Sequence, residues 1–143
     1  MKKSILKILT LIFFTTSLSF ASDNLFSHNY SKSLKTAQKE DKILMLMISQ
    51  PGCPMCIYMK NNTLKDKNVT TYLRKYFQPV EVELGDKTYP EKFDTFVTPT
   101  FFFIDPKTQE AIEEPFRGGA KVPAFLELLK EYKEEKEEDK EYD

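Results

Sequence analysis

The order of apolar and polar residues along the chain predicts four strands. Two stretches are continuously apolar, as in strands that are covered on both faces. A third alternates with period two, so that its apolar residues share one face. A fourth would complete a hairpin after the turn at residues 105–108. In chain order, the predicted strands span residues 42–49, 80–84, 101–104 and 110–116.

Helical spacing of apolar residues predicts helices before, between and after these strands. We place them at residues 30–40, 54–62, 69–77, 90–96 and 122–132. Asn29 or Ser31 would cap the first helix, and Asp66 or Asn68 would cap the third. Gln78-Pro79 would end the third helix. The charged tail, residues 133–143, is expected to be a frayed and solvated extension of the last helix.

The N-terminal segment, residues 1–21, has the layout of a secretory signal peptide. Three lysines and no acid precede an apolar run, and Ser19-Phe20-Ala21 places small residues at positions −3 and −1 relative to a cleavage site after Ala21. The run is shorter than the roughly 20 residues of a membrane-spanning helix, although an uncleaved anchor stays open. We expect cleavage after Ala21, a domain at residues 22–132, the charged tail, and export to an oxidising space, most simply a bacterial periplasm.

The amino-acid composition of the chain limits the kinds of partner that it is expected to bind. The length suits a single domain, and 12 Phe and 7 Tyr supply a core. The formal net charge of −1 becomes −4 when the three lysines of residues 1–21 are removed, and no basic patch stands out. We therefore expect no nucleic-acid partner. His28 is the only histidine, and we expect it at the surface or near a cap rather than in catalysis.

The two cysteines are the main candidates for chemistry. Cys53 and Cys56 are the only cysteines, and they follow an apolar strand and a Pro-Gly turn where a helix is expected to begin. Unpaired N–H groups at a helix N-terminus favour a thiolate at the first sulfur. The second sulfur lies one turn on, close enough to attack a mixed disulfide. The cysteine pair by itself is also compatible with a structural disulfide or with half of a metal site. A disulfide between Cys53 and Cys56 would close a very short loop, however, and would therefore constrain the unfolded chain little.

The predicted order of elements, the C-x-x-C motif and Thr98-Pro99 before the next apolar strand together resemble the thioredoxin superfamily. The resemblance covers nearly all of residues 24–132. Residues 53–82 are similar to exported thioredoxin-related proteins and to the C-terminal domain of DsbD. The fold implied is α/β: a thioredoxin fold in which helices flank a central mixed β-sheet, in a single domain.

The resemblance also implies roles for individual residues. Cys53 matches the exposed nucleophile and Cys56 the more buried resolving cysteine. Pro99 matches the cis-proline that lies against the sulfurs, and Thr98 precedes it. A substrate peptide would then lie along Thr98-Pro99 and over Pro54 and Met55.

Three positions depart from the family pattern. Gly52 stands where thioredoxin has tryptophan, and Met47 stands where many members bury an acid. Such an acid helps to deprotonate the resolving cysteine, and Glu81 or Glu83 on the adjacent strand is the candidate substitute. Proline is the first residue between the cysteines rather than the second, which leaves the direction of electron flow open.

The leading hypothesis is an exported thiol–disulfide oxidoreductase, a reductase or isomerase-like protein, acting on protein disulfides. It would need no tightly bound cofactor or metal, would work as a monomer, and would take electrons from a membrane-embedded relay, which the family implies. One alternative is a copper(I)-handling protein that binds the metal through Cys53, Cys56 and Met55 or Met59. Another is a non-catalytic interaction module.

Overall fold

The computed structural model describes residues 24–141 and contains one mixed sheet of four strands in the order β2-β1-β3-β4. The predicted signal peptide lies outside the described residues. β1 (Ile43–Ser49) pairs in parallel with β2 (Phe77–Glu83) and antiparallel with β3 (Thr100–Ile104). β3 pairs antiparallel with the short β4 (Phe116–Arg117). β1 is thus a central strand, and its C-terminal end leads directly into the cysteine motif.

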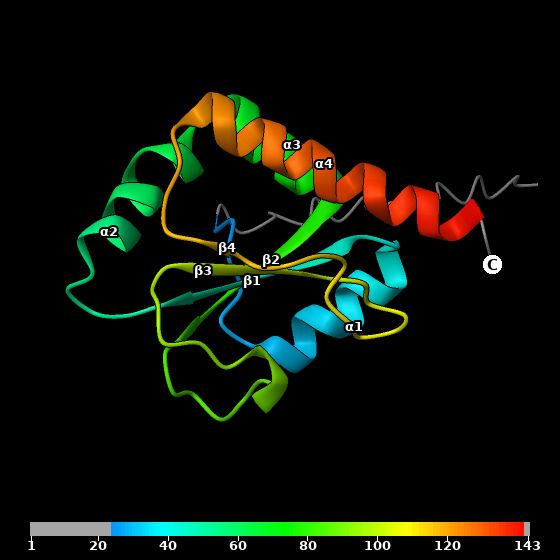
Figure 1. Cartoon of the computed structure of the whole chain (residues 1–143), viewed down its shortest axis with the longest axis horizontal. Helices are drawn as coiled ribbons and strands as arrows, with labels where there is room; N and C mark the ends of the chain where they lie inside the picture. Colours follow the sequence, from blue (N-terminus) through cyan, green and yellow to red (C-terminus); the bar gives the residue numbers. More distant parts are fainter. Residues whose placement is uncertain (1–23, 142–143) are drawn as a thin grey trace, which may run out of the picture.

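Helices cover both faces of the sheet (Figure 1). α1 (Tyr30–Glu40) lies on one face, and α3 (Lys67–Tyr76) and α4 (Val122–Glu141) lie together on the other. α2 (Pro54–Asn61) extends from the end of the sheet and is followed by a 3₁₀ turn at Thr63–Lys65. None of the described helices combines the length and apolar character that crossing a membrane requires.

All seven residues of β1 are buried, and their alternation divides the core into two halves. Met45 and Met47 pack with α3, α4 and the buried side of α2. Leu44, Leu46 and Ile48 pack with α1 and β2 on the opposite face. This double burial explains why the strand reads as a continuous apolar run, and it confirms the predicted α/β architecture.

β3 is held against α4 by aromatic contacts, which fixes the strand that follows Thr98-Pro99. The Phe101 ring lies 5.4 Å from the Phe125 ring in an edge-on arrangement. The Phe103 ring stacks on Tyr132 at a centroid distance of 3.9 Å. Such pairs add to the stabilisation from apolar burial.

β2 begins earlier than predicted. The alternating stretch at residues 80–84 indicates only its second half, and Gln78-Pro79 is predicted to end the preceding helix. Pro79 instead lies inside β2, opposite Met45. A proline is tolerated there because β2 is the last strand on its side of the sheet. Ser27 covers part of the outer edge by donating its N–H to Pro79 O and accepting the N–H of Glu81.

Two other predicted elements are wrong in extent. The helix expected at residues 90–96 is one 3₁₀ turn, Glu91–Phe93, and the chain continues as a loop to Pro99. The strand expected at residues 110–116 is reduced to a single bridge at Ala111 and the two residues of β4. Gln109, in the turn between β3 and Ala111, has a left-handed φ of 61°. Residues 112–115, between the bridge and β4, are bends and loop and form no ladder with β3.

Helix starts follow the predicted caps. The side chain of Asn29 accepts the N–H of Lys32 at 2.8 Å, and Asp66 accepts the N–H groups of Asn68 and Val69. At the other end of the chain, α4 continues to Glu141, so the tail is helical over this part. The expectation that the tail is solvated on all sides is wrong at Lys136, which is buried with its Nζ 3.7 Å from Asp41.

Replacing Asp66 by alanine is expected to lower the free energy of unfolding by about 1 kcal/mol, because two N–H groups at the start of α3 lose their acceptor. Urea denaturation monitored by circular dichroism measures this change. Asn68→Ala, a substitution at an exposed position two residues on, is the control. An equal loss of stability in the two variants would contradict the capping role.

Candidate functional site

Cys53 and Cys56 form a disulfide at the start of α2. Pro51 and Gly52 turn the chain out of β1, and Gly52 adopts a φ of 75° that suits glycine. Pro54 occupies the first turn of α2, where its missing N–H costs no hydrogen bond. Cys53 is partly exposed, whereas Cys56 is only 1% exposed. The two sulfurs therefore differ in access, as a nucleophile and a resolving thiol would.

The helix start provides an electrostatic environment for the Cys53 sulfur. Cys53 is the N-cap of α2, and its Sγ accepts the backbone N–H of Cys56 at 3.2 Å. Unpaired N–H groups and the helix dipole both favour negative charge at this position. In a reduced protein, this arrangement favours the thiolate at Cys53.

The loop before β3 lies against the disulfide. The peptide bond between Thr98 and Pro99 is cis, the isomer that the family resemblance implies. The Thr98 carbonyl oxygen lies 3.5 Å from Cys53 Sγ, and Pro99 O accepts the N–H of Gly118 at 2.8 Å. The loop before β3 thus lies beside the partly exposed sulfur, and Gly118 in turn holds Pro99.

Pro54 and Met55, the residues between the cysteines, are exposed. Met55 lies beside Gly119, where a Cβ atom would collide with the Met55 Sδ and Cγ atoms. A side chain at position 119 would therefore require the flexible and exposed Met55 side chain to move. One turn further along α2, the buried Met59 accepts the N–H of Ala120 through its sulfur at 3.3 Å.

Cys56 is among the residues that line an open cavity of about 500 Å³ on the side of β2. Both candidate acids, Glu81 and Glu83, also line it. Glu81 Oε1 accepts hydrogen bonds from Ser49 Oγ at 2.6 Å and from Lys60 Nζ at 2.8 Å. Glu83 is exposed and has no hydrogen bond or ion pair from its side chain in the described structure. Of the two acids, only Glu81 is built into a network.

The electrostatics of Glu81 follow from these contacts. Burial raises the pKa of the Glu81 carboxyl, but hydrogen bonds from Lys60 and Ser49 outweigh burial, and the pKa is lowered from its ordinary value. Glu81 is therefore a carboxylate at neutral pH. Ser49 and Lys60 belong to no motif that marks them as site residues in the sequence. The one available signal is that Lys60 follows Cys56 by four residues and so shares its side of α2.

His28 is exposed, as expected, and its Nδ1 lies 3.3 Å from the backbone oxygen of Glu81. It does not cap α1, which Asn29 does, but it lines the same cavity as Cys56. Among the described residues, no group of three or more His, Cys, Asp and Glu side chains is placed to hold a metal ion. Of the two methionines in the copper hypothesis, Met59 already has its sulfur engaged by Ala120.

Comparison with known proteins gives one family. The model of a thioredoxin-like domain matches residues 30–133. A search of curated proteins finds no match.

Solved structures with a similar fold include a thioredoxin from Thermus thermophilus. It is 26% identical, with 73% of this chain and 83% of that chain covered and a TM-score of 0.62. The oxidised C-terminal domain of Neisseria meningitidis DsbD is 19% identical over 71% of this chain and 90% of its own, with a TM-score of 0.56. The periplasmic thioredoxin SoxS from Paracoccus pantotrophus, in its reduced form, is 20% identical over 66% of this chain and 98% of its own, with a TM-score of 0.53.

The Glu81 network predicts a pH-dependent contribution to stability. Because folding lowers the pKa of Glu81, its contribution is present at neutral pH and is lost as pH falls through the folded-state pKa. Glu81→Gln is expected to lower the free energy of unfolding by on the order of 1 kcal/mol at pH ~7 and by progressively less below pH ~4. Urea denaturation at a series of pH values measures this, with Glu83→Gln as the control. A deficit that grows toward low pH would contradict the assignment.

Proposed function

The chain belongs to the thioredoxin-like family, and on that basis we propose that it is an exported thiol–disulfide oxidoreductase acting on protein disulfides. The observation that carries the proposal is the asymmetric disulfide: Cys53 is partly exposed at a helix N-terminus, and Cys56 is buried one turn away. A disulfide that served only as a staple would not need one accessible sulfur with an N–H group directed at it.

The proposed reaction, written as a reduction, begins with a Cys53 thiolate and a Cys56 thiol. The Cys53 thiolate attacks one sulfur of a substrate disulfide, so that a bond from Cys53 to the substrate forms and the substrate S–S bond breaks. The departing substrate thiolate takes a proton from water. Cys56 then loses its proton and attacks Cys53 Sγ, which releases the second substrate thiolate and forms the Cys53–Cys56 disulfide. Two electrons pass from the protein to the substrate, and each step can run in reverse.

We propose that the substrate binds along Thr98-Pro99 and over Pro54 and Met55. All four residues flank the reactive sulfur in sequence or in space, and Pro54 and Met55 are exposed. The Thr98 carbonyl oxygen is near enough to Cys53 Sγ to position it or to accept a hydrogen bond from a reduced thiol. Pro99 O accepts the N–H of Gly118, next to β4, which holds the end of this loop.

We propose that Glu81 is the base that receives the proton of Cys56. Its carboxylate is ionised at neutral pH, and it lines the same cavity as Cys56, which has room for bridging water. Both of its hydrogen bonds end on Oε1, so Oε2 is the oxygen that takes the proton. Lys60 keeps the carboxylate in place. Because the buried Met47 stands where many members of the family have an acid, the acid in this chain would come from β2 instead.

We also propose that the chain works as an exported monomer, most simply in a bacterial periplasm. The layout of residues 1–21 supports export, and a periplasmic thioredoxin is among the proteins of similar fold. Reducing equivalents would come from a membrane-embedded dithiol relay, because an exported thiol pair has no access to cytosolic reductants. The exchange itself needs no cofactor beyond the two thiols.

Cys56→Ser is expected to trap the first intermediate, because no resolving thiol remains to release the substrate. The reduced variant should form a stable mixed disulfide with a disulfide-bonded model peptide, which mass spectrometry detects as an adduct of one peptide. Cys53→Ser should react at least ~100-fold more slowly, because Cys56 is buried. Equal adduct formation by the two variants would contradict the assignment of the nucleophile.

Glu81→Gln is expected to slow the resolving step by on the order of 10-fold or more, while leaving formation of the mixed disulfide within about twofold. Rapid-quench mass spectrometry at pH 7 separates the two steps. Glu83→Gln serves as the matched control, since it removes a carboxylate from the same cavity without disturbing the Ser49 and Lys60 bonds. Equal slowing in both variants would mean that general charge, and not Glu81, assists Cys56.

A further inference from the structure

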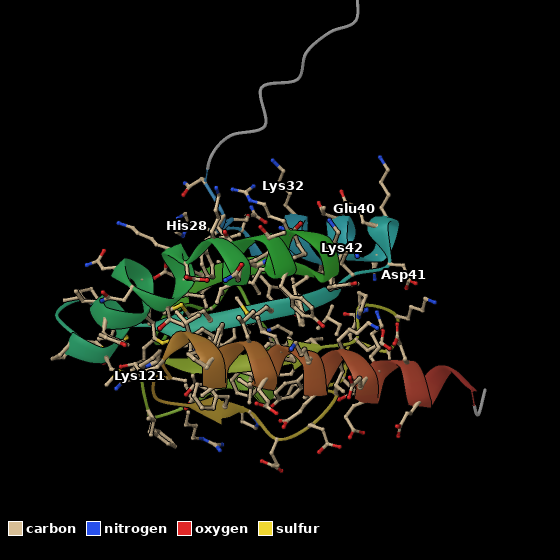
Figure 2. The ribbon with its side chains drawn as sticks, turned by 90° about the horizontal axis from the view of Figure 1, so that it is seen from above. His28, Lys32, Glu40, Asp41, Lys42 and Lys121 are labelled. Carbon is tan, nitrogen blue, oxygen red and sulfur yellow. A yellow bond between two sulfur atoms is a disulfide. The ribbon has the colours of Figure 1, made fainter. Side chains whose placement is uncertain are left out.

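Large apolar side chains that remain exposed gather at the end of the molecule that carries the disulfide. α2 supplies three of them, the loop before Pro99 supplies two, and one follows β2, whereas the described parts of α1, α3 and α4 supply none. Figure 2 shows the charged residues Glu40, Asp41 and Lys42 at the opposite end of the molecule, far from α2, although charged residues such as Lys60 and Glu81 also lie near the disulfide. The exposed apolar residues are Met55, Ile57, Tyr58, Leu84, Phe96 and Val97.

Phe96 is the extreme case, because it is 101% exposed although Phe93 and Thr95, which precede it in the loop, are buried. Phe93, three residues before it, is 2% exposed and packs its ring 5.2 Å from Phe102. Thr95, the preceding residue, is also buried. The loop is therefore anchored immediately before the exposed ring.

Hydrogen bonds fix the loop on the other side of Phe96 as well. Thr95 Oγ1 accepts the N–H of Val97 at 3.2 Å, and Thr100 Oγ1 donates to Val97 O at 2.7 Å. The two threonine hydroxyls lie 3.2 Å apart in the buried interior. A loop held in this way presents Phe96 to solvent in a defined position, and covering such a ring with an apolar partner is favourable.

The two segments that meet at the disulfide are also uncharged. Residues 50–59 and residues 95–104 contain no Asp, Glu, Lys or Arg, in a chain of which 30% of residues are charged. The contact between Thr98 O and Cys53 Sγ joins them. A charged substrate would therefore find no ionic partner within these segments, whereas an apolar one would find Met55, Phe96 and Val97.

We propose that Met55, Phe96 and Val97 form an apolar docking surface for the residues that flank the substrate cysteine. The chain would then select apolar, extended protein segments over small charged disulfides such as glutathione. Attack at sulfur fixes the substrate cysteine at Cys53, so its neighbours in the substrate must pass over the adjoining loop and the start of α2. Phe96 is the specificity-determining residue of this surface. The inference rests on the proposed disulfide exchange.

The test uses three probes that share one leaving group, thionitrobenzoate, joined through a disulfide to a single cysteine. The first probe is a peptide with leucine and phenylalanine around its cysteine, the second has serine and glutamine there, and the third is glutathione. Attack by the reduced protein on the cysteine sulfur releases thionitrobenzoate, whose absorbance gives the rate. The native chain is expected to react at least ~10-fold faster with the apolar peptide than with the other two probes.

Phe96→Ser is expected to reduce the ratio of apolar to polar rates to about twofold, and Phe96→Leu is expected to keep most of it, because leucine retains an apolar side chain. The matched control is Leu84→Ser, which also removes a large exposed apolar side chain. Leu84 follows β2, on the opposite side of β1 from the loop that precedes β3. Its variant should therefore keep the native ratio.

Three outcomes would overturn the inference: equal rates with all three probes in the native chain, an unchanged ratio in Phe96→Ser, or equal losses in Phe96→Ser and Leu84→Ser. In each of these cases the proposed exchange itself would stand, because the probes would still react. Failure of the native chain to release thionitrobenzoate from any probe would instead refute the proposed function. Circular dichroism of each variant checks that the fold is retained.

Discussion

Burial of β1 on both faces is the constraint on which the rest of the site depends. Its seven buried residues fix the strand between β2 and β3, and so fix the point at which the chain leaves the sheet at Pro51. The turn there must bring the chain directly into α2, which places Cys53 at the helix N-terminus and Cys56 against the core. Because β3 is the antiparallel neighbour of β1, the loop before β3 returns to the same end and brings Thr98 to Cys53. A close-packed core thus sets the geometry of the chemistry.

Electrostatics then divide the site between two sides of α2. On the side of β3, the partly exposed sulfur faces an uncharged loop and the N–H of Cys56. On the side of β2, Cys56 lines a cavity that is also lined by Glu81, an ionised carboxylate held by Lys60 and Ser49. Apolar surroundings suit the approach of a substrate, whereas a polar cavity suits the removal of a proton. The proposed roles of Cys53 and Cys56 follow from this division.

Strong local patterns in the sequence predicted most of the fold, and tertiary contacts account for the rest. α1 has the predicted bounds, and Asp66 caps α3, because amphipathic spacing and capping residues act locally. The start of β2 at Phe77 could not be predicted from local pattern, since Pro79 is tolerated there only because the strand lies at the sheet edge. The loop that carries Phe96 is predicted to be a helix, but its shape depends on a contact between the buried hydroxyls of Thr95 and Thr100, which are five residues apart in the sequence.

The same distinction applies to the site. The C-x-x-C motif and Thr98-Pro99 could be recognised in the sequence, whereas the pairing of Lys60 with Glu81 depends on how α2 is placed relative to the end of β2. The central claim is that Cys53 and Cys56 are a redox-active pair, and the most direct test is their reduction potential in dithiol buffers. A redox-active pair is expected to have a reduction potential between about −270 and −120 mV, the range of thioredoxin-like oxidoreductases. A value below about −300 mV, typical of disulfides that resist reduction, would show that the bond is structural and would contradict the account.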